Sequence, residues 1–175
     1  SGHGSDDTLF KSSSHAEAPR ALNFLVLETT SHALDQYRVW GVKFDVGVLT
    51  NVTHEHLDYH KTYENYVKTK AKLLKMARVA VVNRDDNSYE LISKLNPRFN
   101  RGQKSKLPAW QKLQRGEQLK SQKLITYGMT DSSDISPQKF PFKTDLIGEF
   151  NKYNVLAAVA ACRELGIDNK TIREA

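Results

Sequence analysis

The sequence contains few of the residues that define several classes of protein. It has one cysteine, Cys162, among 175 residues, which excludes a disulfide scaffold and a zinc site built on several cysteines. No apolar run approaches the roughly 18 residues that a membrane span needs, and the N-terminus lacks the charged-then-apolar pattern of a secretory signal. We therefore expect a cytoplasmic protein that does not act in a membrane.

Phosphate-binding loops are also missing from the sequence. None of the glycines is followed by lysine, so there is no loop of the G-x-x-x-x-G-K type, and there is no G-x-G-x-x-G either. The sequence likewise holds no G-x-S-x-G elbow and no H-E-x-x-H pair, which argues against nucleophilic hydrolases and zincin proteases.

Acidic residues are nearly absent from one basic segment, which extends from Lys94 to Lys123. This segment has nine basic residues and a single acid, Glu117, so its net charge is +8, whereas the whole chain has +6. Its four glycines and prolines predict an extended surface loop. A polyanion-binding or nucleic-acid-binding module is the alternative, but only Phe99 and Trp110 are available to stack on bases.

The remainder of the chain has the composition of a globular domain, with 39% hydrophobic and 26% charged residues. Residues 1–20 are small and polar, and we expect a flexible leader or vector-derived residues there. Short apolar runs predict buried strands, and apolar spacings of three and four predict helices between them. The strands are expected at 22–27, 45–51, 78–83 and 123–127, and the helices at 62–76, 85–95 and 151–165. This alternation predicts an α/β fold with a mostly parallel sheet covered by helices.

Polar residues follow three of these expected strands, where parallel sheets bind their ligands. They are Glu28 to His32, Thr50 to His60, and Asn83 to Asp86. Helix capping and turn formation would explain any one of these groups. The three imidazoles of His54, His56 and His60 could bind a transition metal, although their spacing alone is weak support.

Lys70 is the one charged residue on the apolar stripe of the helix expected at 62–76. Its neighbours on that stripe include Tyr66, Val67 and Leu74, whereas Lys68 and Lys72 lie off it. A lysine in such a position either extends its amine past the core to solvent or faces a polar site. Both interpretations stay open from spacing alone.

Five motifs follow one another along the chain. They are L-E-T-T-S-H-A-L from Leu27, T-N-V-T-H-E-H-L-D-Y-H from Thr50, Y-x-x-x-K from Tyr66, V-V-N-R-D-D from Val81 and G-E-F-N-K-Y-N-V-L-A-A from Gly148. In this order they resemble the motifs of the Mur ligase central, ATP-binding domain. The H-L-D-Y-H form is most similar to the UDP-N-acetylmuramyl-tripeptide synthetases (MurE-like). The resemblance covers residues 21–175 and implies a P-loop-NTPase-like fold.

The resemblance implies an ATP-dependent ligase of peptidoglycan synthesis that joins an amino acid to a UDP-muramyl-peptide. By the match of the motifs, Glu28, His56 and Lys70 would form the catalytic site and hold Mg²⁺, with Lys70 as a carbamate. Ser31, Gln36 and Arg38 would contact the muramyl-peptide, and Asn151 and Asn154 would lie near the adenine of ATP.

The sequence departs from the family pattern in two main places. The G-T-N-G-K-T-T loop that precedes the first motif in the family is not found, and the 94–123 insertion is longer than usual. We therefore expect a truncated central domain that is inactive by itself. A degenerate homologue with a structural role is a further alternative.

Overall fold

The computed structural model describes residues 24–53, 57–95 and 122–175. Several of the predictions above fall on residues outside these ranges: the leader at 1–20, the imidazoles of His54 and His56, and most of the basic segment at 94–123. The domain boundaries that rest on them stay predictions.

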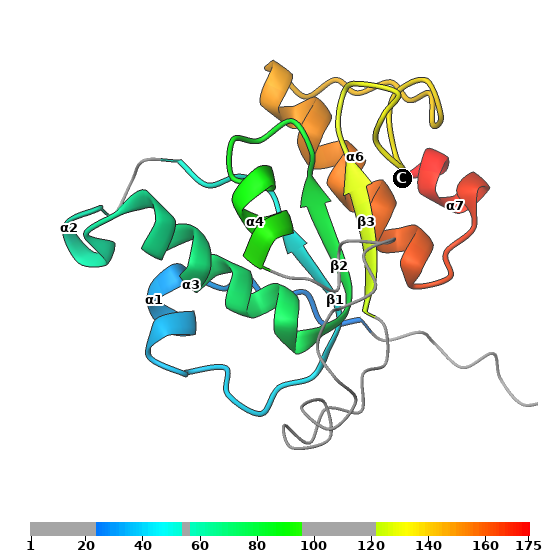
Figure 1. Cartoon of the computed structure of the whole chain (residues 1–175). Coiled ribbons are helices and arrows are strands. Elements are labelled where there is room, and N and C mark those ends of the chain that lie inside the picture. Colours follow the sequence, from blue (N-terminus) through cyan, green and yellow to red (C-terminus); the bar gives the residue numbers. More distant parts are fainter. Residues whose placement is uncertain (1–23, 54–56, 96–121) are drawn as a thin grey trace, which may run out of the picture.

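In the part of the chain that the structure describes, three parallel strands form a central sheet (Figure 1). They are β1 (Phe44–Leu49), β2 (Ala77–Asn83) and β3 (Lys123–Tyr127), in the order β1-β2-β3. In this register Val46 lies opposite Val79, and Val81 opposite Ile125. The central strand β2 is buried on both faces, which explains its nearly continuous apolar sequence. The predicted α/β class and three of the four predicted strands are confirmed.

Helices cover both faces of this sheet. The helices of the described residues are α1 (Ser31–Asp35), α2 (Leu57–His60), α3 (Tyr63–Met76), α4 (Tyr89–Leu95), α6 (Glu149–Glu164) and α7 (Asn169–Glu174). Of these, α3 and α6 contact the strands most extensively, whereas α1 and α2 pack on α3, and α7 packs on α6. Successive residues of β2 point to opposite faces: Ala80 and Val82 pack with α3 and α4, whereas Val79 and Val81 pack with α6. Figure 1 shows α3 and α4 in front of the sheet and α6 behind it. None of the helices in the described part of the chain has the length and apolar character of a membrane span.

The ends of the predicted helices follow local capping signals. Thr62 caps α3, because its hydroxyl accepts a hydrogen bond from the backbone N–H of Asn65. Gly166 follows the last turn of α6 with φ 83°, a left-handed conformation that favours glycine. The helix predicted from Asp85 begins only at Tyr89, because the Asp86 carboxylate accepts from the N–H of Ser88 and forms a turn.

The strand predicted at 22–27 is wrong for the residues that the structure describes. Residues 24–30 form no strand or helix, and Leu25 and Val26 are 89% and 93% exposed. An apolar run becomes a buried strand only when a neighbouring strand pairs with it and a helix covers it. Within the described residues β1 pairs only with β2, so its other edge has no partner strand.

Candidate functional site

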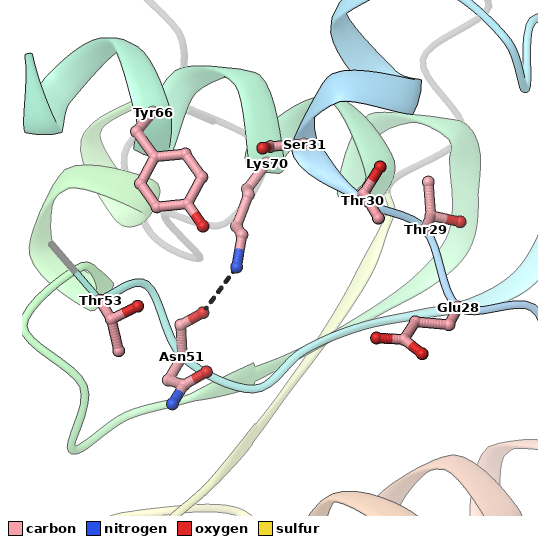
Figure 2. Close-up of a pocket in the computed structure, with 8 residues that line it drawn as sticks. All are labelled: Glu28, Thr29, Thr30, Ser31, Asn51, Thr53, Tyr66 and Lys70. Atoms are coloured by element: carbon pink, nitrogen blue, oxygen red, sulfur yellow. Dashed lines mark hydrogen bonds between the residues drawn. The ribbon is translucent and has the colours of Figure 1, made fainter. Parts of the chain in front are cut away.

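A polar pocket of about 300 Å³ lies between the segment that leads into α1, the loop after β1, and α3 (Figure 2). Its lining residues come from three separate motifs of the sequence. They are Glu28, Thr29, Thr30, Ser31, Asn51, Thr53, Tyr66 and Lys70. Most of them carry hydroxyl, amide, carboxylate or amine groups, so the pocket suits a polar or charged ligand.

The loop after β1 is held by hydrogen bonds to three consecutive carbonyls. Tyr127 donates its hydroxyl to Thr50 at 3.3 Å, Lys70 donates to Asn51 at 3.2 Å, and Tyr63 donates to Val52 at 3.1 Å. Burial raises the pKa of both tyrosines, and the nearby charge of Asp86 adds to the effect. Their phenols therefore stay protonated and remain donors at neutral pH.

Lys70 faces this pocket instead of extending to bulk solvent. Its amine lies 5.0 Å from the centre of the Tyr66 ring, where the ring's quadrupole attracts a cation, and it donates to the Asn51 carbonyl (Figure 2). Lys68 and Lys72 on the same helix pair with carboxylates, at 2.7 and 2.9 Å. Within the described residues no carboxylate lies within ion-pair distance of Lys70.

Helix α1 is fixed at both ends, which places Ser31 beside the pocket. Thr30 caps its first turn by accepting from the N–H of Ala33. At the other end Asp35 accepts from the Lys72 amine at 2.9 Å and from the Tyr59 hydroxyl at 3.0 Å. The hydrogen bond from Lys72, followed by that from Tyr59, lowers the pKa of Asp35. The carboxylate therefore stays ionised and ties α1 to α3.

Glu28 and Thr29 line the pocket from the extended segment before α1. The carboxylate of Glu28 points toward the space that the Lys70 amine also faces, whereas the Thr29 hydroxyl points away from it (Figure 2). The Thr29 hydroxyl is buried and has no hydrogen-bond partner among the residues that the structure describes.

A second polar group lies where the strands end, near the first turns of α6. The Asp85 carboxylate, just after β2, accepts from the N–H of Met129 at 2.7 Å and from the Tyr153 hydroxyl at 3.3 Å. Burial raises the pKa of Tyr153, and the charge of Asp85 raises it further. Asn151 and Asn154 lie on the same stretch of α6, and their side chains bond to each other at 3.1 Å. Figure 1 shows this end of α6 beyond the carboxyl ends of the strands.

The structure brings together some of the predicted site residues and separates others. Glu28, Ser31 and Lys70 share the pocket, whereas Gln36 and Arg38 do not line it and are exposed. The two asparagines of α6 do not line it either, and His56 lies outside the described residues. The roles assigned to all these residues stay predictions.

Comparison with known families agrees with the motifs. A family model of the Mur ligase middle domain matches residues 4–162. The chain belongs to the Mur ligase middle-domain family. The family resemblance predicted from the five motifs is thereby confirmed.

Individual relatives of this Mur ligase domain are longer proteins. UDP-N-acetylmuramyl-tripeptide synthetase 2 of Oceanobacillus iheyensis is 35% identical over an alignment of 167 residues. The match covers 81% of this chain and 29% of that protein. The UDP-N-acetylmuramoyl-L-alanyl-D-glutamate--2,6-diaminopimelate ligase of Geobacter metallireducens is 36% identical, and the match covers 88% of this chain and 31% of that protein. A solved structure of a ligase of that name superposes with a TM-score of 0.62 at 26% identity, covering 83% and 30%. The chain thus spans about three tenths of the length of these relatives.

The sequence analysis assigned no role to five pocket-lining residues of this Mur ligase domain: Thr29, Thr30, Asn51, Thr53 and Tyr66. The position of Tyr66 on the apolar stripe predicts a core residue, and its side chain is indeed only 3% exposed. The i, i+4 spacing of Tyr66 and Lys70 was the available signal, since it puts both side chains on one face of the helix.

The donor set of the pocket fits a hard cation such as Mg²⁺. Within the described residues no three His, Cys, Asp or Glu side chains form a metal-binding cluster. Mg²⁺ nevertheless keeps several waters and needs only one or two carboxylates beside the oxygens of a phosphate substrate. The Glu28 carboxylate, with the hydroxyl and amide oxygens around it, meets that requirement.

Proposed function

We propose that this domain forms the ATP-binding part of a ligase that joins an amino acid to a UDP-muramyl-peptide. The observation that carries the proposal is the single polar pocket shared by Glu28, Ser31 and Lys70, which come from different motifs of the family. Relatives of similar sequence are named as ligases of UDP-muramyl-peptides. ATP and Mg²⁺ are the cofactors that this reaction requires.

In this proposal each predicted residue has a specific role. Glu28, His56 and Lys70 hold Mg²⁺, Ser31, Gln36 and Arg38 bind the muramyl-peptide, and Asn151 and Asn154 lie near the adenine of ATP. When bound, Mg²⁺ neutralises charge on the phosphoryl group that ATP transfers to the substrate carboxylate.

Lys70 contributes its amine in a modified form. The neutral amine adds to carbon dioxide, a new N–C bond forms, and a proton is released, which leaves an anionic carbamate. Carbamate oxygens are hard ligands suited to Mg²⁺. The position of the amine supports this role, because it faces the pocket without a carboxylate partner among the described residues.

The test is a titration of this chain, followed by NMR, with Mg²⁺ in bicarbonate buffer and then with MgATP and UDP-MurNAc-L-Ala-D-Glu. Shifts are expected around Glu28, Asn51 and Lys70. Lys70→Ala and Glu28→Gln should weaken Mg²⁺ binding about tenfold, a loss of about 1.4 kcal/mol. Lys68→Ala is the matched control, because Lys68 lies two residues away on the solvent side of α3.

Identical Mg²⁺ titrations for Lys70→Ala, Lys68→Ala and the unchanged chain would contradict the proposal. If the chain binds none of these ligands, the degenerate homologue is favoured, and retention on RNA at low salt would instead favour the polyanion alternative. We also expect the chain alone to release no phosphate from ATP, because its sequence has no G-K-T loop. Phosphate release that depends on the muramyl-peptide would contradict this expectation.

A further inference from the structure

His60 lies directly behind the pocket without lining it. It is the last residue of α2 and is only 6% exposed. Its Nε2 atom shares a hydrogen bond of 3.0 Å with the Ser31 hydroxyl, which is itself buried. Its ring also stacks on the ring of Tyr66, with centroids 4.9 Å apart and planes inclined by 19°.

These two partners of His60 both line the pocket and come from different helices. Ser31 opens α1, and Tyr66 belongs to α3. The Tyr66 ring in turn carries the Lys70 amine at 5.0 Å. One imidazole therefore contacts both a predicted substrate-binding hydroxyl and the aromatic ring that supports the predicted metal-binding lysine.

The backbone around His60 is held as firmly as its ring. The His60 carbonyl accepts from the N–H of Thr62 at 2.8 Å and from the side-chain amide of Asn65 at 3.4 Å. The next residue, Lys61, has φ 64°, a left-handed conformation that is unfavourable for lysine. Such backbone strain persists where the surrounding contacts over-determine the local structure.

We propose that His60 is a positioning residue, which orients the Ser31 hydroxyl through its hydrogen bond and the Lys70 amine through the Tyr66 ring. The inference rests on the proposed function for the importance of Ser31 and Lys70. The contacts of His60 with Ser31 and Tyr66 are observed in the structure and do not depend on the proposed function. A buried histidine that only fills the core would support the two partners without separable effects on them.

Two substitutions separate the two contacts of His60. His60→Phe keeps an aromatic ring against Tyr66 and removes the hydrogen bond to Ser31. His60→Gln keeps a hydrogen-bonding nitrogen at the same number of covalent bonds from Cβ as Nε2, and removes the ring.

Competitive labelling of lysine amines by a limiting acetylating reagent, read by mass spectrometry, follows Lys70 without any ligand. Lys68 on the same helix gives the internal reference, since its amine pairs with Glu64. His60→Gln should raise the labelling of Lys70 about threefold, because the supporting ring loosens and the cation–ring contact weakens. His60→Phe should leave it unchanged.

The affinity for UDP-MurNAc-L-Ala-D-Glu follows the Ser31 contact. His60→Phe should lower that affinity about threefold to tenfold, the range expected for one lost hydrogen bond, and His60→Gln should restore it. If either His60 variant fails to fold, Ser31→Ala removes the same hydrogen bond and tests the affinity, and Tyr66→Leu removes the same ring contact and tests the labelling of Lys70.

The crossed pattern, in which each variant changes one reading and spares the other, is the expected result. Parallel changes in both readings that follow the thermal stability, or unchanged Lys70 labelling in His60→Gln, would overturn the inference. If the unchanged chain does not bind the muramyl-peptide, the proposed function fails, and the labelling of Lys70 alone then decides the role of His60.

Discussion

The side chains packed between the sheet and α6 differ in kind from those between the sheet and α3. On the α6 side, Val79, Val81 and Leu156 belong to an apolar cluster. The guanidinium groups of Arg163 and Arg173 lie over the ring of Phe140, at 5.0 and 4.2 Å from the ring centre. On the α3 side, an apolar cluster of similar kind is continuous with a tyrosine ring, a buried histidine and a buried serine that lead to the pocket.

The two sides of the sheet therefore contribute differently to the stability of the domain and to the shape of the pocket. The α6 side contributes mainly the burial of apolar surface, which is non-directional and tolerates small shifts. The α3 side contributes burial as well, but its side chains also set the positions of Ser31, Asn51 and Lys70. Truncation of a buried apolar side chain on the α6 side should therefore lower stability without changing the pocket, whereas the same truncation on the α3 side should change both stability and the pocket.

The largest expected effect comes from matched leucine truncations on the two sides. Leu156 of α6 and Leu74 of α3 are 0% and 1% exposed. Leu156→Ala and Leu74→Ala should each lower the free energy of unfolding by about 2–5 kcal/mol, because each removes a fully buried side chain and leaves a cavity. Urea unfolding of the two variants measures this loss.

The labelling of Lys70 distinguishes the two truncations. Leu74 lies one helical turn from Lys70, so Leu74→Ala should raise the reactivity of the Lys70 amine, whereas Leu156→Ala should leave it unchanged. An equal change in both variants would break the comparison between the two sides.

Tyr127 joins the two sides, and its removal should have the next largest effect. It is fully buried in the α6-side cluster, yet its hydroxyl donates to the Thr50 carbonyl in the loop that carries Asn51. Burial, followed by the charge of Asp86, raises its pKa above the ordinary value of 10.0. The folded chain therefore keeps this proton at a pH where the unfolded chain has released it.

The free energy of unfolding should consequently fall as the pH rises above about 10, with full stability from this group below that value. One such proton corresponds to a slope of about 1.4 kcal/mol per pH unit. Tyr127→Phe should lose about 1 kcal/mol at neutral pH with its hydrogen bond, and its alkaline slope should be smaller by one proton. Urea midpoints measured across the alkaline range check this, and equal slopes for both chains would show that Tyr127 does not titrate in this way.

The sequence predicts those parts of the fold that depend on local signals. The apolar runs of β1, β2 and β3 and the apolar spacings of the helices expected at 62–76 and 151–165 each act within a few residues, and each of these elements is confirmed. The run at 22–27 carries the same local signal and fails, because burial of a strand needs a neighbouring strand and a covering helix. Neither requirement can be read from the run itself.

The candidate site divides in the same way. The resemblance predicts one site for Glu28, His56 and Lys70 and a substrate contact for Ser31. Glu28, Ser31 and Lys70 line one pocket, whereas His56 lies outside the described residues. Tyr66 and His60 also stand in two of the motifs, but the resemblance assigns neither of them a role in this pocket, and a tyrosine on an apolar stripe is typical of a core residue. Their contribution depends on a stacking contact between α2 and α3, which only the folded chain reveals.

The smallest expected effect sharpens the comparison at the pocket itself, through two adjacent threonines. Within the described part of the chain the buried Thr29 hydroxyl has no hydrogen-bond partner, whereas the Thr30 hydroxyl caps α1 by accepting from the N–H of Ala33 at 3.2 Å. Thr29→Val should raise the free energy of unfolding by about 1 kcal/mol, because it removes an unsatisfied buried hydroxyl at constant shape. Thr30→Val should lower it by about the same amount through loss of the cap.

Opposite shifts in the urea midpoint are the expected result, and a loss of stability in Thr29→Val would mean that this hydroxyl does have a partner in solution. The pocket side of the sheet therefore holds a position where stability can still be gained, as expected of a surface shaped by binding as well as by packing.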